Sequence, residues 1–298
     1  MATLRDIRDR IKSVKNTRKI TRAMKLVAGA KLNKATKAAL EAQPYQRTLN
    51  RTLRRVVGAV GEDFEHPLLS QPANDTVVYV VAISADRGLC GNFNSMLNKA
   101  AIAECEKHKA AGKTVKVIGY GKKVRTFLGK RGWDLIDGAE NVDPSDYATT
   151  ADELSSRLVA DLGENAFAEV VLVFNQYKSI MEQEPSADRV LPMALEPEQS
   201  DEKKEGGDGE AAASVDYLFE PDGGDLLGRL LPMALRTRLF QAFLETQAGE
   251  QAKRMTAMDS ATRNASDLID RLTLDYNRAR QAAITKELIE IVSGAEAL

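Results

Sequence analysis

Apolar residues recur at helical spacing at both ends of the chain. Near the amino terminus a stripe begins in steps of three and four with Leu4, Ile7, Ile11 and Val14, and it continues roughly through Ile20, Met24, Val27 and Leu32. The period predicts one long helix over residues 3–57. Pro44 is expected to kink or divide this helix, and Gly58 and Gly61 to end it.

The helical period returns from residue 226 to residue 295. Its inward members alternate steps of three and four without a break, and they are Met255, Met258, Thr262, Ala265, Ile269, Leu272, Tyr276, Ala279 and Ala283. Such a run is typical of a coiled-coil seam, the row of side chains that faces a partner helix. Several members are small, so the two helices are expected to approach closely.

Short β-branched runs fill the middle of the chain. Residues 76–83 and 168–174 are nearly continuous apolar runs, which predicts strands buried on both faces. The other expected elements are strands at 114–118 and 133–137 and helices at 94–110, 121–130 and 149–164. Strands that alternate with helices predict a small Rossmann-like α/β domain with a largely parallel sheet. The predicted fold class is mixed, an α/β domain beside a long antiparallel two-helix coiled coil.

These patterns divide the chain into five parts. They are an N-terminal coiled-coil helix at 1–58, an α/β domain at 74–195, an acidic insertion at 196–213, a connecting segment at 214–225 and a C-terminal coiled-coil helix at 226–298. The insertion is rich in Glu, Asp and Gly and has too few apolar residues to offset the entropy of ordering, so we expect it to be disordered.

Charge is divided unevenly along the chain. Residues 1–55 contain sixteen Lys or Arg and three Asp or Glu, whereas the whole chain has a net charge of −1. Such a basic arm indicates either a solvated helix face or an acidic partner. A nucleic-acid partner is an alternative, but the arm offers no aromatic residues for base stacking and shares its helix with the predicted seam.

The two long helices flank one domain, so they must pair antiparallel. Residue 56 should then lie beside residue 226, and paired residue numbers should add to about 282 because both helices rise 1.5 Å per residue. Met24 falls near Met258, and residues 282–298 have no helix beside them. This last segment is apolar over most of its circumference, through Ala282, Ala283, Ile284, Leu288, Ile289, Ile291, Val292 and Ala295. Such a helix is buried by something, so a partner is expected to supply a sleeve.

Candidate chemistry is sparse. Cys90 and Cys105 are expected to be free thiols, and two histidines are too few for a zinc site. The glycines of residues 84–94 and 119–122 match neither a P-loop nor a complete dinucleotide fingerprint. A hydrolase is the other alternative, but no nucleophile motif supports it. We therefore expect no catalytic residue, cofactor or metal. The first residues have no apolar signal region, and no run is long enough to span a bilayer.

Several segments resemble the gamma subunit family of F-type ATP synthases. They are residues 11–17, 20–25, 86–91, 254–258, 276–282 and the carboxyl-terminal run 284–297. The resemblance covers both ends of the chain and the domain between them, in the order of the family.

The resemblance implies a non-catalytic rotor shaft. Its coiled coil would lie in a hexamer of alpha and beta subunits, and its foot would bind the epsilon subunit and the membrane ring of c subunits. Proton flow would turn the shaft and drive ATP synthesis in the beta subunits. The protein would lie at the cytoplasmic face of the bacterial inner membrane, attached only peripherally.

The resemblance also implies contact residues. Those expected to meet the alpha and beta subunits are Met24, Lys25, Arg254, Gln281, Thr285 and Glu287. Phe219 and Glu220 are expected to meet the c ring or epsilon. The family often has Tyr where this chain has Phe219, so a hydroxyl contact is not expected there.

Overall fold

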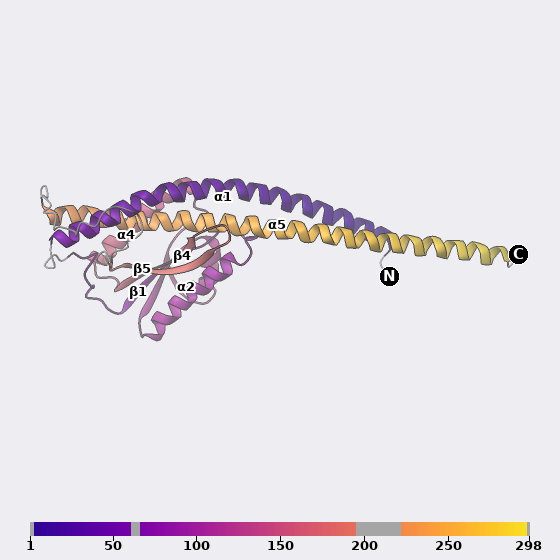
Figure 1. Cartoon of the computed structure of the whole chain (residues 1–298). Helices are drawn as coiled ribbons and strands as arrows, with labels where there is room; N and C mark the ends of the chain where they lie inside the picture. Colours follow the sequence, from indigo (N-terminus) through magenta and orange to yellow (C-terminus); the bar gives the residue numbers. More distant parts are fainter. Residues whose placement is uncertain (1–2, 61–65, 195–221, 297–298) are drawn as a thin grey trace. The chain divides into compact units, whose positions relative to one another are not determined.

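A computed structural model describes residues 3–60, 66–194 and 222–296. The chain forms two compact units, and both long helices contribute to each of them (Figure 1). Unit 1 contains residues 1–31, 89–91 and 251–298, and unit 2 contains residues 32–88 and 92–250. The acidic insertion and most of the connecting segment lie outside the described residues.

Helix α1 spans Leu4–Val60 and begins with a reciprocal cap. The backbone amide of Thr3 donates to the Asp6 carboxylate at 2.9 Å, and the Asp6 amide donates to the Thr3 hydroxyl at 3.2 Å. This arrangement satisfies two amides that lack partners in the first turn. Pro44 does not divide the helix. Pro44 and Leu40 are both exposed, so water can reach the carbonyl that the missing amide leaves unpaired.

Helix α5 spans Gly223–Glu296. It begins three residues before the predicted start, because Asp222 caps it. The Asp222 carboxylate accepts from the amide of Gly224 at 3.0 Å, and its carbonyl accepts from the amide of Leu226 at 3.1 Å. A negative side chain at this end also complements the helix dipole.

The sheet of unit 2 has five strands. In chain order they are β1 Val77–Ile83, β2 Thr114–Tyr120, β3 Asp134–Asp137, β4 Glu169–Tyr177 and β5 Gln183–Leu191. Their spatial order is β3-β2-β1-β4-β5, and all pairs are parallel except β4 with β5. The predicted Rossmann-like, largely parallel sheet is confirmed.

Helices cover both faces of this sheet. Helix α2 spans Phe93–Ala110, α3 spans Lys122–Gly129, and α4 spans Tyr147–Gly163 after a short 3-10 turn at Pro144–Asp146. Tyr79, Val81 and Ile83 of β1 join the core formed with α1, α4 and α5, whereas the intervening β1 residues are buried on the side of α2 (Figure 1). Burial on both faces explains why this strand reads as a continuous apolar run.

Strand β5 was not predicted. Its first seven residues, Gln183–Arg189, contain no large apolar side chain and include Pro185, so neither alternation nor hydrophobicity marks them as a strand. Such a sequence suits the edge of a sheet, where one side of the backbone has no partner strand.

Gly121 makes the turn between β2 and α3 possible. Its φ is +93°, and a Cβ at this position would lie 2.2 Å from the carbonyl oxygen of Ser84. The close approach of these two backbones joins the carboxyl ends of β1 and β2. Only glycine combines this φ with so little space.

We predict that Gly121→Ala lowers the free energy of unfolding of unit 2 by about 3 kcal/mol, because backbone strain and a clash add together. Gly112→Ala is the matched control, since Gly112 also has a positive φ (+79°) but has open space around it. The control should cost only about 1 kcal/mol. Urea unfolding followed through the single tryptophan, Trp133, measures both values. Equal losses in the two variants would contradict the role given to the Ser84 contact.

Candidate partner-binding surface of the coiled coil

The two long helices pair antiparallel in unit 1. Three contacts define the register, Arg8 with Tyr276, Thr21 with Thr262 and Lys25 with Asp259. The paired numbers add to 284, 283 and 284, close to the expected sum. The predicted antiparallel coiled coil is confirmed, with partners displaced by one or two residues.

The predicted seam of α5 is confirmed, whereas that of α1 is partly wrong. All nine predicted seam residues of α5, from Met255 to Ala283, are buried or half-buried. On α1, however, Ile20 is 60% exposed and Val27 is 57% exposed. Continuing from Val14 in steps of four and three, the seam passes through Arg18, Thr21, Lys25, Ala28 and Leu32. The helical period places polar and small residues inward here and leaves two larger apolar residues outside.

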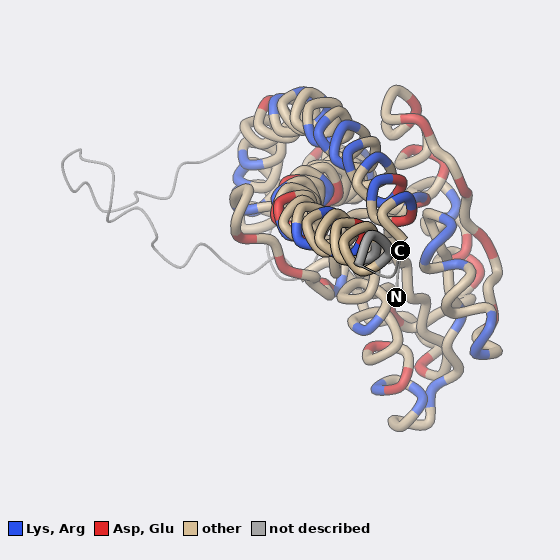
Figure 2. Tube along the Cα trace, turned by 90° about the vertical axis from the view of Figure 1, so that its right-hand side faces the viewer, with Lys and Arg blue, Asp and Glu red and all other residues tan. Residues whose placement is uncertain are grey.

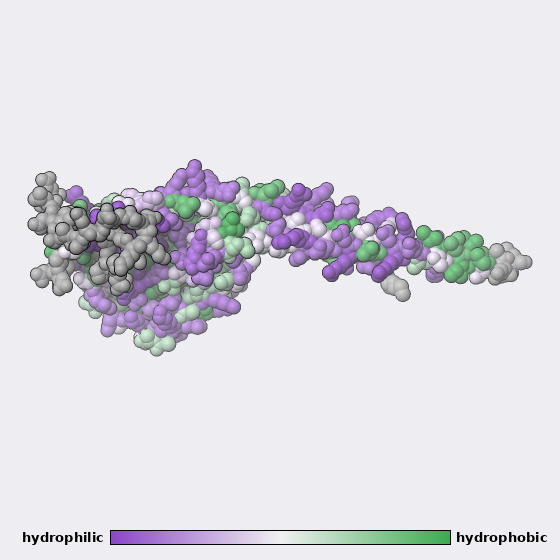
Figure 3. All heavy atoms as spheres, in the orientation of Figure 1, coloured by the Kyte–Doolittle hydropathy of each residue, from purple (hydrophilic) through white to green (hydrophobic). Residues whose placement is uncertain are grey.

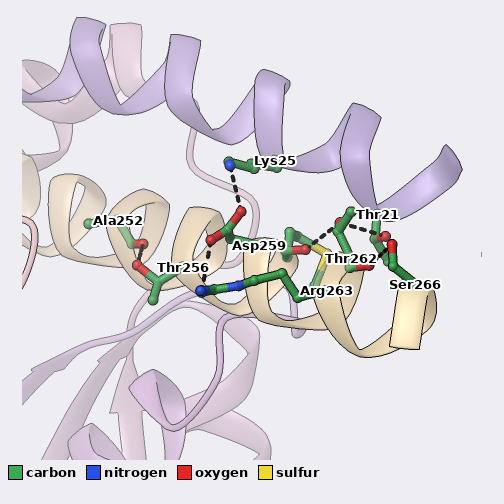
Figure 4. Close-up of polar contacts among 9 residues, drawn as sticks. Thr21, Lys25, Ala252, Thr256, Asp259, Thr262, Arg263 and Ser266 are labelled. Atoms are coloured by element: carbon green, nitrogen blue, oxygen red, sulfur yellow. Dashed lines mark hydrogen bonds and ion pairs between the residues drawn. The ribbon is translucent and has the colours of Figure 1, made fainter. Parts of the chain in front are cut away.

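A polar cluster therefore occupies the middle of the seam (Figure 4). The Asp259 carboxylate accepts from Lys25 across the two helices and from Arg263 at 2.9 Å along its own helix. The hydroxyl oxygens of Thr21 and Thr262 are 2.8 Å apart. These contacts are directional, so they favour one register over a slip by a helical turn.

The same cluster fixes the charge state of Asp259. The hydrogen bond from Lys25, with the charges of Lys25 and Arg263, lowers the pKa of Asp259 below its usual value of 3.8. A carboxyl with a lowered pKa adds stability above its unfolded pKa, and this contribution is lost as pH falls through the folded value. The bridge is therefore intact at neutral pH.

A second contact lies near the start of α1. Arg8 donates to the Tyr276 hydroxyl at 2.8 Å, and its guanidinium lies 5.7 Å from the centre of the Tyr276 ring. The hydrogen bond lowers the pKa of Tyr276 and raises that of Arg8. Only one more helical turn of α1 precedes this contact, so α5 continues beyond the end of its partner helix.

That continuation exposes an apolar surface, which we call the tip (residues 282–292). Its large side chains are between 50% and 67% exposed, and they are Ile284, Leu288, Ile289, Ile291 and Val292. Figure 3 shows them as a green region at the end of the helix. No described part of unit 1 covers them. Among the residues that the structure describes in unit 1, α1 ends before the tip, as the register predicts.

The predicted contact residues fall into two groups. Met24, Lys25 and Arg254 are half-buried, Lys25 belongs to the polar cluster, and Arg254 lies one helical turn before Met258. Gln281, Thr285 and Glu287 are exposed on the last turns of α5. Phe219 and Glu220 lie outside the described residues. The two groups thus differ in burial, and on α5 they lie more than 25 residues apart.

Most basic residues of α1 within unit 1 face outward, Arg18 and Lys25 in the seam being the exceptions. Figure 2 shows Lys and Arg recurring along this helix, and those exposed within unit 1 are Arg5, Arg8, Arg10, Lys12, Lys15, Lys19, Arg22 and Lys31. The exposed apolar side chains of Ile20, Leu26 and Val27 lie among them. The sequence prediction missed this mixed surface and the role of Asp259. The opposite charges of Lys25 and Asp259 at seam positions were the available signal.

The described residues provide little for catalysis. Cys90 and Cys105 are both buried, and burial raises the pKa of Cys105 to about 12, so its thiol is protonated at neutral pH. No group of three His, Cys, Asp or Glu among the described residues is arranged to hold a metal ion. None of the described helices contains an apolar stretch long enough to cross a membrane.

The chain resembles chains in two solved structures of ATP synthases. The chain resembles a chain in the Euglena gracilis mitochondrial ATP synthase, titled OSCP/F1/c-ring, with a TM-score of 0.63, covering 99% of this chain and 94% of that one at 18% identity. It also resembles a chain in the Tetrahymena thermophila central stalk and c-ring structure, with a TM-score of 0.55, covering 81% and 99% of the two chains at 21% identity. At these identities the likeness concerns the fold.

Sequence relatives are closer. A family model described as ATP synthase matches residues 3–298. The ATP synthase gamma chain of Pelotomaculum thermopropionicum is 43% identical, and that of Dinoroseobacter shibae is 42% identical, each alignment covering 100% of both chains. The helices, the sheet and these full-length matches together show that the chain belongs to the ATP synthase gamma chain family.

Proposed function

We propose that this chain is the central rotor shaft of a rotary ATP synthase. It couples proton-driven rotation of a membrane c ring to conformational cycling of the catalytic beta subunits. The observation that carries the proposal is the tip, an apolar helix end that the described chain leaves uncovered. A helix that is apolar over most of its circumference is normally buried, and an exposed apolar patch of this kind marks a site where another protein binds.

The sleeve is a hexamer of alpha and beta subunits. Five large tip side chains are already about half covered by their own helix. Covering the remainder contributes on the order of 1 kcal/mol for each side chain. The polar groups beside the apolar tip come from Gln281, Thr285 and Glu287.

The region around Lys25 and Asp259 makes the contacts with the beta subunits that differ from one rotation angle to the next. Met24, Lys25 and Arg254 meet an acidic lever loop of a beta subunit, which the outward basic residues of α1 attract. A partner shifts a conformational equilibrium only through contacts that differ between its states. Switching a site almost completely takes about 5.5 kcal/mol of such difference. The shaft must therefore be asymmetric and stiff, and the polar cluster supplies stiffness by fixing the register.

The remaining contacts lie at the foot. Phe219 and Glu220 meet the c ring or the epsilon subunit. The chain itself catalyses no reaction and binds no cofactor. It lies at the cytoplasmic face of a bacterial inner membrane and is held there through the complex.

Reconstitution tests this proposal. The chain should co-purify with alpha and beta subunits, and the assembled complex should pump protons into vesicles when ATP is added. Failure to assemble with these subunits would overturn the rotor assignment. Salt-sensitive binding of the isolated chain to DNA, together with that failure, would instead favour the nucleic-acid alternative.

We predict that deleting residues 286–298 leaves unit 2 folded and weakens coupling, because most of the apolar bearing is lost. The measurement is the ratio of ATP-driven proton pumping to ATP hydrolysis in vesicles, with Trp133 fluorescence as the check on unit 2. A control that replaces only Ser293 by Ala should behave as wild type. Full pumping by the truncated complex would remove the tip from the mechanism.

We also predict that Met24→Lys lowers the same ratio. The new ammonium would stand next to Lys25, near the Lys25–Asp259 bridge, and would change the charge that the beta subunit meets. Met24→Leu is the matched control because it keeps an apolar side chain of similar volume. Identical ratios for the two variants would show that charge at this position is irrelevant.

A further inference from the structure

We infer that the carboxyl edge of the sheet is a clamp that grips α5 and carries torque between the α/β domain and this helix. The inference rests on the proposed rotor function, which it deepens by naming the residues that hold the shaft. All the contacts involved lie within unit 2.

The clamp occupies the place where related sheets bind ligands. Strand β1 is central, and the chain continues from it to β2 on one side and later to β4 on the other. In open parallel sheets, ligands bind outside the carboxyl ends of the strands where the order reverses in this way. That point lies here between the ends of β1 and β4.

Helix α5 fills this crevice. From Leu239 to Gly249 no residue is exposed. The ring of Phe243 packs edge-on against Tyr120, with centroids 5.0 Å apart, and stacks on Tyr147 at 5.3 Å. The hollow that remains beside Phe243 and Thr246 measures about 30 Å³, which is room for one water molecule and not for a nucleotide.

Side chains of the protein also bind the backbone amides that could otherwise hold a phosphate. The Asp86 carboxylate accepts from the amide of Lys122 at 2.8 Å, and the Ser84 hydroxyl accepts from the amide of Val124 at 3.0 Å. These amides form the start of α3, where an anionic ligand would otherwise bind. The carboxyl edge of the sheet is therefore occupied by α5, and the amides at the start of α3 are bound by side chains from the loop after β1.

The grip is tightest at Gly249. A Cβ at this position would lie 1.9 Å from Asn175 Oδ1 and 3.3 Å from the Phe93 ring. One turn earlier, the Thr246 hydroxyl accepts from the backbone amide of Asn175 at 3.2 Å. At Gly249 the α5 backbone thus packs directly against the Asn175 side chain of β4, with no room for a Cβ between them. Sliding α5 by one residue would bring Ala248 or Glu250 to a place where only glycine fits.

A second grip lies eleven residues earlier on the helix, at Arg238, about 16 Å away. The Arg238 guanidinium pairs with Asp188 of β5 and lies 4.6 Å from the centre of the Phe174 ring. Two separated grips resist both sliding and rolling of the helix. A single contact would allow the domain to pivot about it.

Gly249→Ala tests the clamp. Gly228→Ala is the matched control, because Gly228 is also in α5 but has nothing within 4 Å of a new Cβ. Both changes raise helix propensity equally, so any difference reports the contact with Asn175. In complexes assembled with each variant, we expect Gly249→Ala to lower the ratio of proton pumping to ATP hydrolysis at least about threefold and Gly228→Ala to leave it unchanged.

A second change distinguishes the clamp from a general loss of stability. Asn175→Ala removes the oxygen that a Cβ at 249 would meet but keeps the backbone amide that binds Thr246. Asn175→Ala combined with Gly249→Ala should therefore restore the ratio. A ratio for Gly249→Ala equal to that of wild type would overturn the inference, and so would a loss that Asn175→Ala does not rescue.

A disulfide tests whether the grip is permanent. A Cβ at position 249 would lie 2.9 Å from Asn175 Cγ, close to the separation of about 3 Å between Cβ and the opposite sulfur in a disulfide. Oxidising a complex with Asn175→Cys and Gly249→Cys should leave pumping unchanged, since clamp and helix move together. Pumping that stops on oxidation and returns on reduction would show that the domain must move along α5, and would overturn the clamp.

The wild-type complex separates this inference from the function on which it rests. If wild type fails to pump, the rotor assignment fails whatever the variants do. If wild type pumps and the variants are indistinguishable from it, only the clamp is lost.

Discussion

Everything in unit 1 depends on the antiparallel pairing of α1 with α5. The pairing fixes which residues face each other, so it places Lys25 opposite Asp259 and Arg8 opposite Tyr276. It also ends where α1 begins, one turn before Arg8. The apolar residues beyond that point are exposed because of this difference in helix length, and the proposed function rests on them.

Much of this arrangement could be predicted from the sequence. The α5 seam, β1 and β4 follow from periodicity and β-branched runs, and the register follows from counting residues along two helices of equal rise. The α1 seam was harder, because Thr21 and Lys25 face inward while Ile20 and Val27 face outward. Hydrophobicity alone selects the apolar residues. Which face of α1 turns inward is decided by Asp259 and Thr262 on α5, and these residues lie far away in the sequence.

Strand β5 and the clamp could not be predicted from the sequence for a related reason. Asn175 and Gly249 are each unremarkable in their own segments, and their significance comes from one contact across the fold. The glycine-rich turns after β1 and β2 resemble ligand loops, yet their polar groups bind the protein itself. A Rossmann-like sheet therefore does not indicate a nucleotide site here, which illustrates that function is decided by the site and not by the fold.

The exposed end of α5 has a mechanical consequence in the proposed rotor. Its large side chains are aliphatic and form no hydrogen bonds, so dispersion and water exclusion are what hold it, and neither depends strongly on direction. Turning such an end inside an apolar ring changes its energy little from one angle to the next. The helix end then acts as a low-friction pivot, and the work of distinguishing one orientation from another falls to the charged residues farther down the shaft.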